Sequence, residues 1–215
     1  MPADPLSPML ASPGSVPSGS AWMWEWKWDG CRAVATIDGV VKLFSRNVND
    51  ITSSYPDVAE ALGLSAAGKT MVVDGELVVL NKAGQPDFSL LQRRMHVARP
   101  TAALIRTVPV VYFVFDILDV DGESMRHLPY VERRRILDEL DLAEGNRVQV
   151  PPNMSDVDGA TLMKIAAEHG IEGIVAKRAD SIYRPGVRSK SWTLFISAVL
   201  EQVSPIGCGV NSAIP

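Results

Sequence analysis

The stretch Trp-Met-Trp-Glu-Trp-Lys-Trp-Asp-Gly-Cys-Arg, residues 22–32, decides the fold expected for this chain. Tryptophan stands at every second position from 22 to 28, a period of two that predicts a strand with one aromatic and one mixed face. Glu25 and Lys27 then point the same way, because alternate residues of a strand share a face. Asp29-Gly30 is the signal that ends this strand.

Strands and helices alternate irregularly in the rest of the chain. Further strands are expected at 32–38 and 39–45, joined by a turn at Asp38-Gly39, and at 70–80, 108–118, 171–177 and 192–196. Helices are expected at 56–62, 88–96, 129–140 and 156–169. Asp74-Gly75-Glu76 interrupts the apolar run of 70–80. Without regular βαβ units, this pattern predicts an α+β domain of antiparallel sheets flanked by helices.

Composition limits the classes of protein that the chain can represent. Its 215 residues, 47% of them apolar, suffice for one main domain, expected at 21–196 between a Pro- and Ser-rich arm (1–20) and a tail (197–215). A net charge of −4 excludes a globally basic nucleic-acid-binding protein, so any polynucleotide must be held locally. Arginines at 93–106 and 133–135 are candidates, although both groups could equally be solvated helix faces.

The cellular setting follows from what the sequence lacks. Two distant cysteines form neither a disulfide framework nor a zinc site, which favours a reducing, cytoplasmic location. The first 20 residues show no secretory signal. No apolar run approaches the roughly 20 residues that cross a bilayer, so no membrane partner is expected.

Lys27 is the candidate nucleophile, in the pattern Lys-x-Asp-Gly followed by Arg32. A lysine attacks phosphorus only as the free amine, and with an ordinary pKa near 10.4 only about one molecule in a thousand is neutral at pH 7.4. A site that uses a lysine this way must favour the amine, by burial or by neighbouring cations such as a divalent metal. Alone, the pattern is more often that of a surface lysine at a strand end.

The ordered motifs resemble those of the ATP-dependent DNA ligases, members of the covalent nucleotidyltransferase superfamily, which also contains RNA ligases and mRNA capping enzymes. The resemblance covers roughly residues 5–192. It is carried by segments 27–32, 44–47, 72–77, 112–116, 172–177 and 183–189. The run Pro-Met-Leu-Ala at 8–11 and the phrase Glu-Trp-Lys-Trp-Asp-Gly-Cys-Arg are most similar to the ligase domain of bacterial ligase D and related actinobacterial ligases.

This resemblance implies the nucleotidyltransferase (ligase adenylation) fold and a set of site residues. Lys27 would become adenylylated. ATP would be bound by Glu25, beside the adenine, and by Lys27, Arg32, Arg46, Glu76, Phe115, Lys177 and Arg188. Phe115 would stack on the purine, and Lys177 would contact the α-phosphate. Glu76 and Glu172 would hold magnesium or manganese, as hard cations prefer carboxylates. Each residue also has a plainer interpretation, such as Glu25 pairing with Lys27 or Phe115 filling the core, and Asp74 is expected to be structural.

The implied activity is nick sealing in DNA repair or recombination. AMP passes from the lysine to a 5′-phosphate, and a 3′-hydroxyl displaces it. The partners would be nicked or broken DNA, other DNA-repair proteins, or a separate domain that supplies an oligonucleotide-binding (OB) fold. An RNA ligase or capping-type nucleotidyltransferase, and a non-catalytic nucleotide-binding remnant, remain as alternatives.

The chain departs from the family pattern after Trp192. The family's last core motif is Trp-x-Lys-x-Lys, with both lysines on the triphosphate, whereas this chain has Leu194 and Ile196 at those positions. A lost charge-stabilising donor typically costs a factor of about 10²–10³ in rate, so reduced activity is expected. The 19 residues 197–215 are too few for an OB fold, and the abrupt loss of pattern suggests a truncation or a frame change.

Overall fold

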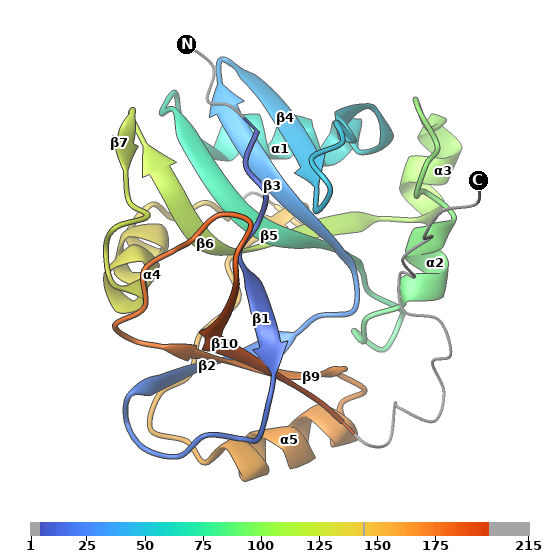
Figure 1. Cartoon of the computed structure of the whole chain (residues 1–215). Coiled ribbons are helices and arrows are strands. Elements are labelled where there is room, and N and C mark those ends of the chain that lie inside the picture. The colour runs from blue at the N-terminus through green and yellow to red at the C-terminus, as the bar shows by residue number, and fades with distance from the viewer. Residues whose placement is uncertain (1–4, 144, 198–215) are drawn as a thin grey trace, which may run out of the picture.

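The chain folds into two stacked sheets with helices on their outer sides (Figure 1). The computed structural model describes residues 5–143 and 145–197. One sheet has four strands in the order β1-β10-β9-β2; the other has six, with the path β4-β3-β5-β6-β7 and β8 paired to β6. In both sheets the strand pairs are antiparallel, except that β1 pairs in parallel with β10 and β6 pairs in parallel with β8. The predicted α+β class is therefore confirmed.

The elements have the following bounds. The strands are β1 (Leu10–Pro13), β2 (Trp22–Lys27), β3 (Cys31–Asp38), β4 (Val40–Ser45), β5 (Met71–Val79), β6 (Val110–Val120), β7 (Glu123–Ser124), β8 (Val148–Gln149), β9 (Gly173–Arg178) and β10 (Arg188–Ile196). The helices are the 3-10 turn η1 (Thr52–Ser54), α1 (Pro56–Ser65), α2 (Phe88–Gln92), α3 (Ala102–Thr107), α4 (Tyr130–Glu139) and α5 (Gly159–Glu168).

The six-stranded sheet follows the sequence prediction closely. β3 and β4 form the expected hairpin, which turns at Gly39 with φ 65°. β5 lies within the predicted run 70–80 and continues through Asp74-Gly75-Glu76, while its register with β6 shifts between Val72 and Val73 and between Asp74 and Gly75. Gly75 is needed there because a Cβ would lie 2.5 Å from the carbonyl oxygen of Phe113.

The four-stranded sheet contains a strand that was not predicted from the sequence. β1 lies in the segment expected to be an arm, and it pairs in parallel with β10, which itself begins at Arg188 rather than at residue 192. β2 and β9 pair so that Lys27 stands opposite Gly173. A Cβ at Gly173 would overlap the carbonyl of Phe195, so only glycine permits this close approach of β9 and β10.

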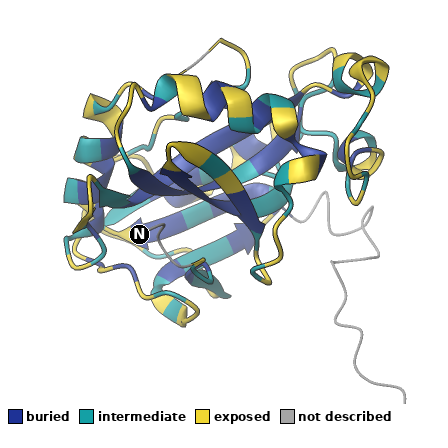
Figure 2. Cartoon of the chain, turned by 90° about the horizontal axis from the view of Figure 1, so that it is seen from above, coloured by how far each residue is buried: buried dark blue, intermediate teal, exposed yellow. Residues whose placement is uncertain are grey.

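Apolar side chains fill both sides of the stacked sheets, and Figure 2 shows the strands as mostly buried and the outer helix faces as exposed. The main core lies between the six-stranded sheet and α1, and includes Leu62, Val73 and Tyr112. Trp24 packs with Leu162 of α5 and Ile174 of β9, so part of the predicted aromatic face of β2 is in the core under the smaller sheet.

None of the helices in the described ranges has both the length and the apolar character of a membrane span. The expected tail at 197–215 lies outside the described residues from position 198 onward. Short elements that the sequence prediction missed are α3, β7 and β8.

Candidate active site

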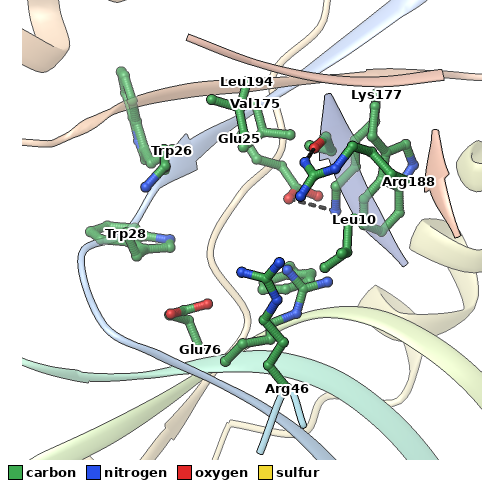
Figure 3. Close-up of a pocket in the computed structure, with 15 residues that line it drawn as sticks. Leu10, Glu25, Trp26, Trp28, Arg46, Glu76, Val175, Lys177, Arg188 and Leu194 are labelled. Carbon is green, nitrogen blue, oxygen red and sulfur yellow. Dashed lines mark hydrogen bonds and ion pairs between the residues drawn. The ribbon is translucent and has the colours of Figure 1, made fainter. Parts of the chain in front are cut away.

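A cavity of about 230 Å³ opens between the two sheets, and side chains from both converge on it (Figure 3). It contains all eight residues that were expected to bind the nucleotide: Glu25, Lys27, Arg32, Arg46, Glu76, Phe115, Lys177 and Arg188. Seven further residues complete the lining and were not predicted to bind the nucleotide: Leu10, Ala11, Trp26, Trp28, Val175, Trp192 and Leu194. The lining carries five cationic side chains and two carboxylates, which suits a polyanionic ligand.

Lys27 is the last residue of β2, where the strand reaches the cavity. Its ammonium group forms an ion pair with the carboxylate of Glu172, which precedes β9, and both side chains are about a quarter exposed (25% and 23%). Glu25 lines the same cavity, as expected from its strand face, but it does not pair with Lys27. The nucleophile candidate is therefore accessible and next to the predicted metal-binding carboxylate.

Glu25 instead holds Lys177 in a buried network. The Nζ atom of Lys177 lies 2.7 Å from Glu25 Oε2, and the Tyr130 hydroxyl of α4 donates to the other oxygen of Glu25. Three rings surround the ammonium group, with centroids 4.4 Å (Phe115), 4.9 Å (Tyr130) and 4.2 Å (Trp192) away. Such cation–π contacts are favourable, yet burial lowers the pKa of Lys177. Tyr130 is a site residue that sequence reasoning missed, because nothing marks a helix tyrosine as facing a distant strand.

Arg32 is fixed by a buried carboxylate. Its Nε and Nη2 atoms donate to the two oxygens of Asp74 at 2.6 and 2.7 Å, and the Tyr183 hydroxyl also donates to Asp74. The guanidinium lies 4.5 Å from the centroid of Phe115. A bidentate pair sets the guanidinium plane, so the structural role expected for Asp74 is to orient Arg32 at the cavity wall.

Glu76 and Glu172 are the candidate metal ligands. Burial raises the pKa of Glu76 to about 8, and the neighbouring carboxylates of Asp74 and Glu172 act in the same direction. Burial also raises the pKa of Asp29, which Glu172 raises further. A cation would relieve this crowding of acids. Magnesium is usually held by one or two carboxylates and completed by substrate phosphates.

Arg46 and Arg188 are exposed members of the cavity lining, and Leu194 is partly buried. Arg46 follows β4 and is exposed, and Arg188 donates to the carbonyl oxygen of Ala11 in β1. Leu194 stands opposite Val175 of β9, and both line the cavity. An apolar side chain therefore occupies the position of the first lysine in the motif Trp-x-Lys-x-Lys.

Within the two arginine clusters, Arg94, Arg133 and Arg134 are buried and structural, whereas Arg93, Arg99 and Arg106 of the first cluster are exposed. Arg94 is fully buried on Asp57, and Arg133 is fully buried with Nε and Nη2 at 2.7 and 2.9 Å from the oxygens of Asp116. Arg134, 3% exposed, donates to the carbonyl oxygen of Pro151. Arg135 is exposed but pairs with acids of its own helix. Neither cluster is simply a solvated helix face, and the arginines at 133–135 offer no free basic surface.

Comparisons with known proteins agree with this geometry. The family model described as "ATP dependent DNA ligase domain" matches residues 8–194. The chain is 39% identical over 192 residues to the "Multifunctional non-homologous end joining DNA repair protein LigD" of Mycobacterium tuberculosis, covering 88% of this chain and 24% of that protein. It is 33% identical over 218 residues to a DNA ligase of Thermococcus onnurineus, covering 96% and 38%.

Solved structures give the same result. The M. tuberculosis LigD ligase domain superposes with a TM-score of 0.75 at 38% identity, over 89% of this chain and 60% of that one. A mycobacterial DNA ligase D complexed with ATP has a TM-score of 0.74 at 38% identity, over 88% and 59%. The chain thus spans about a quarter to two fifths of the length of these curated relatives, 24% and 38%.

Proposed function

This chain belongs to the ATP-dependent DNA ligase family, and we propose that its cavity binds ATP and transfers AMP to Lys27. The observation that carries the proposal is the convergence of eight separately predicted residues on one cavity. They come from both sheets and lie more than 160 positions apart at the extremes, from Glu25 to Arg188. A polar set of this kind at one cavity is the usual sign of a ligand site.

The proposed reaction begins with attack of the Lys27 amine on the α-phosphorus. A nitrogen–phosphorus bond forms, the bond to pyrophosphate breaks, and the nitrogen loses a proton. Phe115 and Val175 would bound the base, while Lys177 and Arg32 supply fixed positive charge for the transferring phosphoryl group. Glu76 and Glu172 would hold a divalent cation, magnesium or manganese, whose charge neutralises phosphate oxygens when it is bound.

The second and third steps define the nucleic-acid substrate. AMP passes from Lys27 to the 5′-phosphate at a nick or break in DNA, and the 3′-hydroxyl then displaces AMP and closes the strand. We place this activity in cytoplasmic DNA repair, because the relatives are named as DNA ligases and as an end-joining DNA repair protein. Other repair proteins or a separate OB-fold domain would be partners, and the adenylation domain predicted at 21–196 would also include β1 from the preceding arm.

A second candidate function is nucleotide binding without turnover. The observation that favours it is Leu194, an apolar residue in the cavity lining. A nucleotide could still be held by the remaining five cations, while transfer is slowed because one charge-stabilising donor is missing.

The deciding experiment is incubation with α-labelled ATP and magnesium, followed by denaturing electrophoresis. Covalent label is expected on the wild-type chain and not on Lys27→Ala. Lys82→Ala is the matched control, because Lys82 is exposed in a turn outside the cavity. Binding of ATP without covalent label would favour the second candidate, and label that persists in Lys27→Ala would remove Lys27 as the nucleophile. Labelling by GTP in place of ATP would favour a capping-type enzyme. The labelled chain is then offered nicked DNA and nicked RNA, and transfer of AMP to the RNA alone would favour an RNA ligase.

A further inference from the structure

A second hollow, of about 580 Å³, lies where β2 begins, β9 ends and β10 begins. We call it the rim groove. Its lining includes three cations, Arg178, Arg184 and Lys190, and one carboxylate, Asp180. Serine hydroxyls and Trp22 complete most of the wall. Nothing in the adenylylation chemistry above uses these residues.

The charge of the rim groove is opposite in sign to that of the whole chain. Three cations and one carboxylate leave a local excess of two positive charges, on a protein with 21 basic and 25 acidic residues. Asp180 pairs with Arg178 at 2.6 Å. Arg184 and Lys190 are exposed and form no ion pair with any residue of the described ranges.

Another surface hollow shows that this excess is not general. It is lined by Arg134 and Arg135 but also by Asp138 and Glu139, and these acids pair with the two arginines. The cations of that hollow are therefore already neutralised, whereas two of the three in the rim groove are available to an external anion.

The loop that carries Arg184 is anchored from within. Ser181 and Tyr183 are buried, and they alternate with exposed Ile182 and Arg184. Tyr183 donates from its hydroxyl to Asp74 and from its backbone N–H to the carbonyl of Arg126. The Ser181 carbonyl accepts from Arg133. Side chains on a backbone held in this way are presented in a fixed place, which reduces the entropy lost on binding.

The rim groove and the active-site cavity share two strands. Lys177 lines the cavity and the next residue, Arg178, lines the groove; Arg188 lines the cavity and the next residue, Ser189, lines the groove. Successive strand residues point to opposite faces, so positive side chains lie on both faces at this end of the four-stranded sheet. A polyanion that reaches the cavity mouth could continue around this edge.

We propose that the rim groove binds backbone phosphates of the DNA whose 5′-phosphate is adenylylated in the cavity. The proposal rests on the proposed function. Exposed arginine and lysine side chains, together with hydroxyl groups, bind the phosphates of a DNA backbone independently of its sequence. A free nucleotide or inorganic phosphate shares that chemistry, but all three cations are exposed on an open surface rather than converging at depth, which favours a long polyanion.

The test compares Arg184→Ala/Lys190→Ala with the wild-type chain. Affinity for a nicked, 5′-phosphorylated duplex is measured by fluorescence anisotropy over a series of salt concentrations. The double variant should bind more weakly, and its slope of log K against log salt should be shallower by about 1.8, from about 0.9 per lost contact. Lys82→Ala/Lys164→Ala, which removes two exposed cations elsewhere, should keep the wild-type slope.

Each other outcome counts against the groove in a distinct way. Equal slopes for the groove and control variants, or a wild-type chain that does not bind the duplex at low salt, would overturn the proposal. Inorganic phosphate, added at constant ionic strength, is the second probe. If it displaces DNA from wild type but not from the double variant, the groove is a free-phosphate site. Adenylylation of Lys27 should be the same in the double variant as in the wild-type chain. Absence of label on the wild-type chain would therefore contradict the proposed function and not the groove proposal alone.

Discussion

Replacement of Leu194 by lysine should accelerate adenylylation of Lys27. Leu194 lines the cavity, and its neighbour across the sheet, Val175, also lines it. A lysine stem can pack along Val175 while its ammonium group extends toward solvent-accessible cavity space. The substitution would raise the number of cationic side chains in the lining from five to six.

The size of the gain follows from what one fixed donor contributes. Removal of a single charge-stabilising donor costs about 10²–10³ in rate, or roughly 2.7–4 kcal/mol. A flexible lysine at a partly exposed site is less well fixed than an evolved donor, so we expect about a tenfold to hundredfold gain. Stability should change by less than about 1 kcal/mol, because Leu194 is not fully buried.

The assay is the initial rate of covalent labelling with α-labelled ATP at saturating magnesium. Leu194→Met is the matched control, since it introduces an unbranched apolar chain like the stem of lysine but adds no charge. Leu194→Lys combined with Lys27→Ala should show no label. A rate for Leu194→Lys that equals the wild-type rate, or a gain that Leu194→Met reproduces, would refute the electrostatic argument for this end of the cavity.

Three further perturbations test other parts of the site. Tyr130→Phe removes the hydroxyl that donates to Glu25. The labelling rate should fall by a larger factor than the KM for ATP rises, because the Glu25–Lys177 ion pair becomes less well fixed while no contact to ATP is removed. Glu76→Gln should raise the Tm at pH 8.5 but not at pH 5. The raised pKa of about 8 means that the carboxyl favours folding below its unfolded value of 4.5, an advantage lost as the pH rises through 8. Asp116→Ala should cost about 3–5 kcal/mol in urea unfolding, because it leaves Arg133 as an unpaired buried charge, and Arg133→Met should recover part of that loss.

The sequence predicted those features that depend on local pattern. Alternation of tryptophans predicted β2, and Asp38-Gly39 predicted the β3–β4 hairpin, because strand period and turn chemistry are properties of a few neighbouring residues. β1 escaped because its four residues become a strand only by pairing with β10, more than 170 positions away. Short segments of this kind carry no signal of their own.

The site residues also show what local sequence can and cannot predict. The ordered motifs identified eight residues that line one cavity, but the ion-pair partners of their charged side chains were not predictable. Glu25 could have paired with Lys27 by strand spacing, yet it pairs with Lys177, because β9 lies beside β2 and supplies a buried ammonium group. Arg94 and Arg133 were candidates for a basic surface and instead satisfy buried acids. Charge pairing depends on which strands become neighbours, and that is decided by the whole fold.

The two lysine–carboxylate pairs should respond differently when a triphosphate enters. Lys27 and Glu172 are each about a quarter exposed (25% and 23%), and exposed pairs are worth only about 0–1 kcal/mol. Lys177 and Glu25 are 2% and 8% exposed, and breaking such a pair from one side costs about 3–5 kcal/mol. Phosphate should therefore displace Glu172 first, which frees the proposed nucleophile and the proposed metal-binding carboxylate together, while Lys177 stays fixed. Accordingly, Glu25→Gln should lower the Tm strongly and Glu172→Gln hardly at all, although both should abolish labelling; equal losses of Tm would show that the two pairs do not differ.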